Sequence, residues 1–135
     1  MSRSDAAYKL CLTVIEHEMG SDETGTDELT AAARRVFGSQ YVGTFGCDQI
    51  PTVIDGQSYI VNTEPSTASG AHWLAVYCDG DRLIGYDSFG RDIHETVQES
   101  ESDAEQMVHE SNCGQRCLAW LCVVYGLGVD DALEV

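Results

Sequence analysis

The stretch that most constrains the fold lies near the C-terminus, at residues 113–125, and reads CGQRCLAWLCVVY. It is almost entirely apolar after Arg116. Ser111 and Asn112 just before it are typical helix N-cap residues, and Gly126 and Gly128 just after it are typical of a helix end. A helix that is apolar on all sides has to be buried. The segment therefore predicts a helix in the middle of a domain, with its N-terminus near the surface.

The length of the chain fits one domain with one hydrophobic core. It has 135 residues, of which 43% are apolar, and this composition is typical of a globular protein despite the high net charge. We expect a single domain over residues 1–135, with N-terminal helices within 4–38 and a core region at about 41–126.

Two helices are predicted before the core region. Residues 4–19 carry apolar side chains at three- and four-residue spacing, with Ser4 as the candidate N-cap and Gly20 as the end. A helical pattern resumes over residues 27–37 and stops at Gly38.

The core region predicts a small β-sheet. Residues 41–45 and 58–62 are short β-prone segments, and a hairpin is expected over 71–87, where AHWLAVYC and RLIGYD flank Asp79-Gly80-Asp81. The first hairpin strand is largely apolar on both faces, so it should be central and covered on both sides. A short helix is expected around 93–98. The pattern predicts an α+β fold in which a small, mainly antiparallel sheet packs against the buried helix.

The charge and hydropathy exclude several classes of protein. Only 7 Lys and Arg residues stand against 23 Asp and Glu, and the net charge is −16. The cations are scattered, which argues against a basic face that binds nucleic acid. No apolar run approaches the ~18–20 residues of a membrane span, and the N-terminus lacks the apolar region of a signal peptide. We expect a soluble, monomeric protein that is not secreted.

The six cysteines are expected to be mostly reduced, because a chain of this length and apolar content does not need disulfide staples. Cys113, Cys117 and Cys122 are spaced C-x3-C-x4-C, which is not the pattern of two zinc knuckles. We therefore expect no metal and no cofactor.

Cys113 would stand at the first turn of the buried helix, where unpaired amides and the helix dipole favour a negative charge. Such a position suits a nucleophile, but a small buried apolar cysteine is an equally good interpretation of Cys113 alone. The apolar interpretation suits Cys117 and Cys122, which lie further along the helix.

A cysteine nucleophile needs a base, and the base needs a group that orients it. His72 opens the buried strand, whereas the other histidines lie in polar surroundings: His17, His94 and His109. Asp87 ends the partner strand of the hairpin, so pairing of the strands could bring its carboxylate to the imidazole. Gln106, seven residues before Cys113, could join the Cys113 amide as a donor to an oxyanion.

The order His72, Asp87, Gln106, Cys113 resembles that of the adenovirus protease (adenain) family, in a clan that includes the ubiquitin-like-protein proteases. The matching segments cover most of the chain: YVGTFGCDQIP (41–51), YIVNT (59–63), GAHWLAVY (70–77), IGYDSFGR (84–91) and SNCGQRCLAWL (111–121).

The resemblance implies a role for each of these residues. His72 is the general base, Asp87 orients it, Cys113 is the nucleophile, and Gln106 forms the oxyanion hole with the Cys113 amide. Asp87 stands where the adenovirus enzymes carry Glu. Two further positions match: Trp73 is expected beside the cleft, and Asp48 occupies an acidic position of the family, whose function stays open.

The function that the resemblance implies is that of a cysteine endopeptidase acting through a thioester. We expect a viral late protein that cleaves capsid or core precursors during virion maturation, in the virion and in the nucleus or cytoplasm of the infected cell. Its polypeptide substrates would carry small residues, often Gly, near the scissile bond.

The regulation of the family is expected to carry over less well. The adenovirus enzymes are stimulated by DNA and by a viral peptide that joins through a disulfide. Here the charge of −16 argues against DNA stimulation, and no cysteine between Cys78 and Cys113 could receive such a peptide, so any activating peptide stays unknown.

Three alternatives remain open from the sequence. The chain could be a protease that removes ubiquitin-like tags by the same chemistry. It could also be a non-catalytic binding module that retains the fold, or a redox protein based on thiols or a metal.

Overall fold

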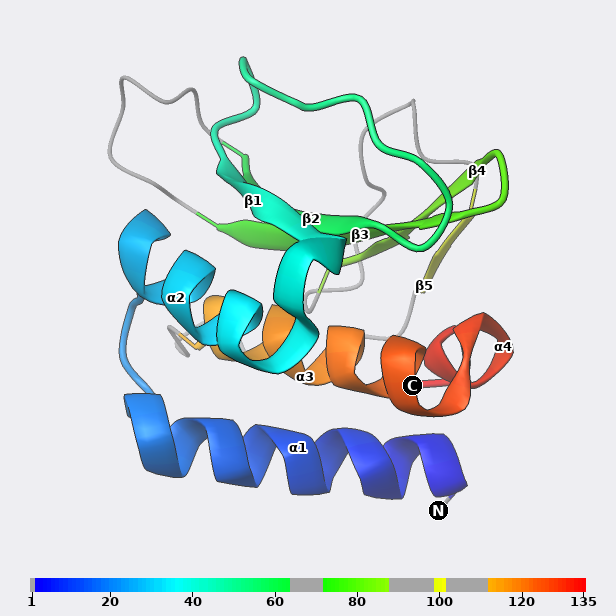
Figure 1. Cartoon of the computed structure of the whole chain (residues 1–135). Helices are drawn as coiled ribbons and strands as arrows, with labels where there is room; N and C mark the ends of the chain where they lie inside the picture. Colours follow the sequence, from blue (N-terminus) through cyan, green and yellow to red (C-terminus); the bar gives the residue numbers. More distant parts are fainter. Residues whose placement is uncertain (1, 64–71, 88–98, 102–111) are drawn as a thin grey trace.

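The computed structural model describes residues 2–63, 72–87, 99–101 and 112–135, and for 99–101 only the backbone is considered (Figure 1). Its elements follow the order α1 (Arg3–Met19), α2 (Thr26–Phe37), the 3-10 turn η1 (Gly38–Gln40), β1 (Tyr41–Phe45), β2 (Ser58–Asn62), β3 (Trp73–Asp79), β4 (Arg82–Tyr86), β5 (Glu99–Glu101), α3 (Cys113–Leu127) and α4 (Val129–Ala132). The expected α+β class is confirmed. The helix expected around 93–98 lies outside the described residues.

The strands form one mixed sheet in the order β1-β2-β3-β4-β5. The central pairs β2–β3 and β3–β4 are antiparallel, as expected, but the outer pairs β1–β2 and β4–β5 are parallel. Parallel neighbours require a long connection that returns the chain to its starting edge. Residues 46–57 provide that connection between β1 and β2, so the expectation of a mainly antiparallel sheet holds only for its centre.

The hairpin that precedes the candidate site is confirmed. Asp79 pairs with Arg82, so Gly80 and Asp81 form a two-residue turn, in which Gly80 has a φ of 65°. The Arg82 guanidinium donates to the Asp79 carboxylate at 2.8 Å and closes the turn. This register sets which residues at the far end of the hairpin face one another.

Strand β3 is central and covered on both faces, as its sequence predicts. On one face Ala75 belongs to the main core with the helices. On the other face Leu74 and Val76 pack with Tyr59 and Val61 of β2. In Figure 1 the helices lie on one side of the sheet and the connection from β1 to β2 lies on the other.

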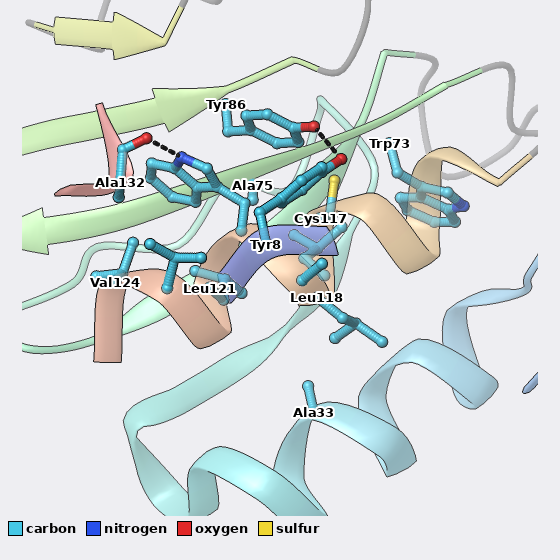
Figure 2. Packing of buried hydrophobic residues seen from close by; sticks show 14 of the residues in the cluster. Tyr8, Ala33, Trp73, Ala75, Tyr86, Cys117, Leu118, Leu121, Val124 and Ala132 are labelled. Carbon is cyan, nitrogen blue, oxygen red and sulfur yellow. Dashed lines mark hydrogen bonds between the residues drawn. The ribbon is translucent and has the colours of Figure 1, made fainter. Parts of the chain in front are cut away.

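Helix α3 lies between the sheet and α1 (Figure 1). Its side chains are buried from Cys113 to Leu121, which confirms the prediction of a buried helix. Trp120 is stacked on Tyr86 with ring centroids 5.5 Å apart, and its indole N–H donates to the Ala132 carbonyl at 3.0 Å (Figure 2). The N-terminus of α3 therefore belongs to a helix that is held in the core by these contacts.

Three predicted helix ends need comment. Ser4 is not the N-cap of α1, because Ser2 takes that place by accepting the Asp5 amide at 3.1 Å, and Ser4 lies buried within the helix. Gly20 ends α1 as predicted. Gly126 does not end α3, because glycine can continue a helix; the end is at Gly128, which has a φ of 101°.

No helix in the described part of the chain is long and apolar enough to cross a bilayer.

Two glycines of α3 give a matched test of its packing. A Cβ at Gly114 would lie 2.1 Å from Thr24 Oγ1 and 2.9 Å from a Leu29 methyl, whereas a Cβ at Gly126 would meet nothing within 4 Å. We predict that Gly114→Ala lowers the free energy of unfolding by about 1–3 kcal/mol through overpacking. Gly126→Ala should raise it by about 0.5–1 kcal/mol through lower chain entropy. Urea denaturation measures both, and equal stability of the two variants would contradict this packing.

Candidate active site

His72 and Asp87 meet at the open end of the β3–β4 hairpin. His72 directly precedes β3, and Asp87 directly follows β4. His72 Nε2 lies 2.6 Å from Asp87 Oδ1, and the two residues are only 4% and 2% exposed. The carboxylate therefore fixes the orientation of the imidazole within a nearly dry environment.

Cys113 joins this pair from α3, of which it is the first residue. Its side chain hydrogen bonds with the His72 imidazole, and this contact helps to raise the pKa of that ring. The backbone amide of Trp73 donates to Cys113 Sγ at 3.4 Å. The sulfur thus sits between an imidazole and an amide donor, at the end of a helix whose dipole favours negative charge.

The protonation of His72 reflects these neighbours. Burial lowers the pKa of His72, but hydrogen bonds and charge interactions with Asp87 and Cys113 raise it by more, and the net shift is upward from the ordinary value of 6.5. An imidazole with a raised pKa holds a proton more readily, as a base that must accept the thiol proton requires.

The connection between α1 and α2 accepts hydrogen bonds from two residues next to the candidate site. The side-chain amide of Gln115 donates to the carbonyls of Gly20 and Asp22, both at 2.8 Å. The Trp73 indole N–H donates to the Thr24 carbonyl at 3.1 Å. Sequence reasoning missed the role of Gln115, although a glutamine inside a buried apolar helix signals a polar side chain that needs a partner.

The remaining predicted residues are placed as follows. Gln106 lies outside the described residues, so its role in an oxyanion hole stays a prediction. Trp73 is buried next to the thiol, and Asp48 is exposed on the connection between β1 and β2. Of the other histidines, His17 is exposed on α1, whereas residues 94 and 109 are outside the described residues.

The other thiols differ from Cys113 in their surroundings. All six cysteines are free. Burial raises the pKa of Cys117 well above its usual range, and burial together with the neighbouring Cys11 raises that of Cys122 to about 12. Burial, followed by nearby aspartates, also raises the pKa of Cys78. These three thiols are therefore poor nucleophiles near neutral pH.

The described part of the chain contains no group of three or more His, Cys, Asp and Glu side chains arranged to bind a metal ion.

Comparison of the chain with models of known protein families gives no match, and no curated protein matches it significantly. A carboxylate, an imidazole and a thiol are hydrogen-bonded in series at a helix N-terminus. In this arrangement the carboxylate orients the imidazole, and the imidazole can take the thiol proton and later return it.

The link between Asp87 and His72 predicts a measurable titration. We expect Asp87→Asn to lower the pKa of His72. Burial lowers this pKa, and the variant lacks the negative charge of Asp87 that opposes the effect of burial. NMR titration of the His72 ring measures this shift. Asp79→Asn, at the other end of β3, is the control and should leave the His72 pKa in place. An unchanged His72 pKa in Asp87→Asn would show that the carboxylate does not act on the imidazole.

The same raised pKa has a consequence for stability. A group whose pKa is raised by folding stabilises the protein fully when the pH is below the pKa of that group in the unfolded chain, which is near 6.5 for histidine. This stabilisation is lost as the pH rises through the pKa of the group in the folded protein. The stability difference between the wild type and His72→Ala should therefore shrink over that pH range.

Proposed function

We propose that the protein is a cysteine endopeptidase that hydrolyses peptide bonds through a thioester on Cys113. The observation that carries the proposal is the position of the His72 imidazole, whose Nε2 lies 2.6 Å from the Asp87 carboxylate and which also hydrogen bonds with the Cys113 thiol. The three residues come from separate elements, and this order of groups is the one that nucleophilic catalysis by cysteine requires.

The proposed reaction has two halves. The His72 imidazole takes the proton from Cys113 Sγ, and the thiolate attacks the carbonyl carbon of the scissile bond. The resulting oxyanion would accept a hydrogen bond from the Cys113 amide, with Gln106 as the second expected donor. The C–N bond then breaks, and His72 passes its proton to the leaving amine, which departs and leaves a thioester.

Water completes the cycle. His72 takes a proton from a water molecule, whose oxygen attacks the thioester carbonyl carbon. The C–S bond breaks, the acid product leaves, and the proton returns to the thiolate. Throughout both halves Asp87 holds the imidazole in one orientation and stabilises its charged form.

A purely structural His–Asp pair is the competing explanation for this geometry. A buried charge pair is weak support for stability, because the desolvation of both groups offsets their attraction. Structure alone also gives no reason for a thiol that hydrogen bonds with this imidazole from the first residue of a helix. Catalysis accounts for both features.

The class of substrate is proposed from the resemblance of the quoted motifs to the adenovirus protease family. We propose that the protein cleaves capsid or core precursor proteins of a virus during particle maturation, at sites with small residues such as Gly. The net charge of −16 favours activity without DNA. A protease of ubiquitin-like proteins would share the chemistry and differ in the substrate.

A thiol-directed suicide substrate with Gly next to the reactive carbonyl tests the proposal. We predict one adduct per chain, located on Cys113 by peptide mapping. His72→Ala should slow the labelling at least 100-fold, because the base then no longer takes the thiol proton. Cys47→Ser removes an exposed thiol that is not one of the three residues of the candidate site and should label like the wild type.

Peptide hydrolysis is measured in parallel. Cys113→Ala should abolish cleavage of a Gly-containing peptide, and a cleavage rate that persists in this variant would refute the assignment. A ubiquitin-like protein extended beyond its C-terminal Gly-Gly serves as the alternative substrate. Preferential cleavage of that fusion would replace the proposed viral substrates with ubiquitin-like ones.

A further inference from the structure

Asn112, the residue before the proposed nucleophile, departs from the usual behaviour of its type. It occupies the N-cap position of α3 and is 4% exposed. Asparagine at an N-cap normally accepts an amide hydrogen bond from the first turn of the helix. In the described part of the chain its side chain makes no such capping bond. Its amide group must therefore be held by other partners.

Both ends of the Asn112 side chain are indeed engaged elsewhere. Arg116 Nε donates to Asn112 Oδ1 at 3.1 Å, and Asn112 Nδ2 donates to Glu16 Oε2 of α1 at 3.2 Å. The oxygen that would cap the helix is thus turned toward the side chain of Arg116, one turn further along α3.

Arg116 is itself held in place inside the protein. It is 9% exposed, and its Nη1 donates to the Tyr8 hydroxyl at 3.1 Å. The Tyr8 hydroxyl also bonds the Tyr86 hydroxyl at 2.7 Å, as Figure 2 shows. Tyr86 directly precedes Asp87 in the chain. A buried series of hydrogen bonds therefore runs from the residue before the nucleophile to the residue before the carboxylate, and it passes through α1.

We propose that Arg116 and Tyr8 are positioning residues that hold the Asn112 side chain away from the first turn of α3. The amides of Gly114 and Gln115 are the usual partners of an N-cap side chain. With Asn112 diverted, these amides and the helix dipole keep their full effect on the anions that form at Cys113. This inference rests on the proposed function.

A double-mutant cycle on Arg116 and Asn112 tests the proposal. Arg116→Met keeps the length of the side chain and removes its donors. It should lower kcat about fivefold to tenfold in the wild-type chain, because Asn112 is released to cap the helix. In a chain that already carries Asn112→Ala, the same substitution should change kcat less than twofold. KM should stay within about twofold in both backgrounds.

The alkylation rate of Cys113 by iodoacetamide, followed by peptide mapping, gives a readout that does not require peptidase activity. It should fall with Arg116→Met in the wild-type chain and not in the Asn112→Ala chain. If this pattern appears while no peptide is hydrolysed, the proposed function fails and the positioning role stands. If peptides are hydrolysed but Arg116→Met has the same effect on both rates in both backgrounds, the positioning role fails.

Tyr8→Phe is a milder variant for the case in which Arg116→Met does not fold. It removes one hydroxyl from the series and should lower kcat about twofold to threefold, again only where Asn112 is present. Tyr125→Phe is the matched control, since the Tyr125 hydroxyl bonds Gly56 and Ser58 outside this series. An equal effect of the two Tyr variants would overturn the proposal.

Discussion

The burial of α3 on all sides is the constraint on which the rest of the structure depends. A helix with apolar residues around its whole circumference needs cover on opposite faces, and here the sheet provides one cover and α1 the other. Full burial of each large apolar side chain contributes roughly 1.5–3 kcal/mol. The N-terminus of this buried helix is where Cys113 meets His72, so the packing of the core also sets the geometry of the candidate site.

The polar groups around the site follow from the same arrangement. Burial of α3 would leave the side-chain donors of Gln115 and Arg116 without water. The N-terminal part of the chain provides acceptors for them, at the Gly20 and Asp22 carbonyls for Gln115 Nε2 and at the Tyr8 hydroxyl for Arg116 Nη1. Helix α1 and the connection after it therefore do more than cover apolar surface. They hold the first turn of α3, which bears the proposed nucleophile, from the side opposite to the sheet.

The elements with strong local patterns could be predicted from the sequence. The strands at 41–45 and 58–62, the hairpin turn at Gly80 and the buried α3 depend on short-range periodicity and turn chemistry, and each is present. The parallel outer pairs were not predicted, because pairing partners depend on the path of long connections. The adjacency of His72 and Asp87 follows from the hairpin, whereas the approach of Cys113 depends on how α3 packs on β3 and was expected only from the order of residues in a resembling family.

The polar support of the site shows why the rest could not be predicted. Arg116 and Tyr8 are 108 positions apart, and no local pattern connects them. The sequence predicts a cap at Ser111 or Asn112, and Asn112 occupies the N-cap position, but its diverted side chain depends on Glu16 and Arg116 together. Such networks form between elements that meet only in the folded protein, so they become visible when the structure is known.

The central claim is that Cys113 forms a covalent acyl intermediate during turnover. It is tested most directly by mixing the protein with a peptide ester, quenching in acid within the first turnover, and mapping the mass of each peptide fragment. The account predicts one acyl group per chain, on the fragment with Cys113, which disappears as the ester is consumed. Hydrolysis with no acyl group on Cys113, or an acyl group on another residue, would contradict it.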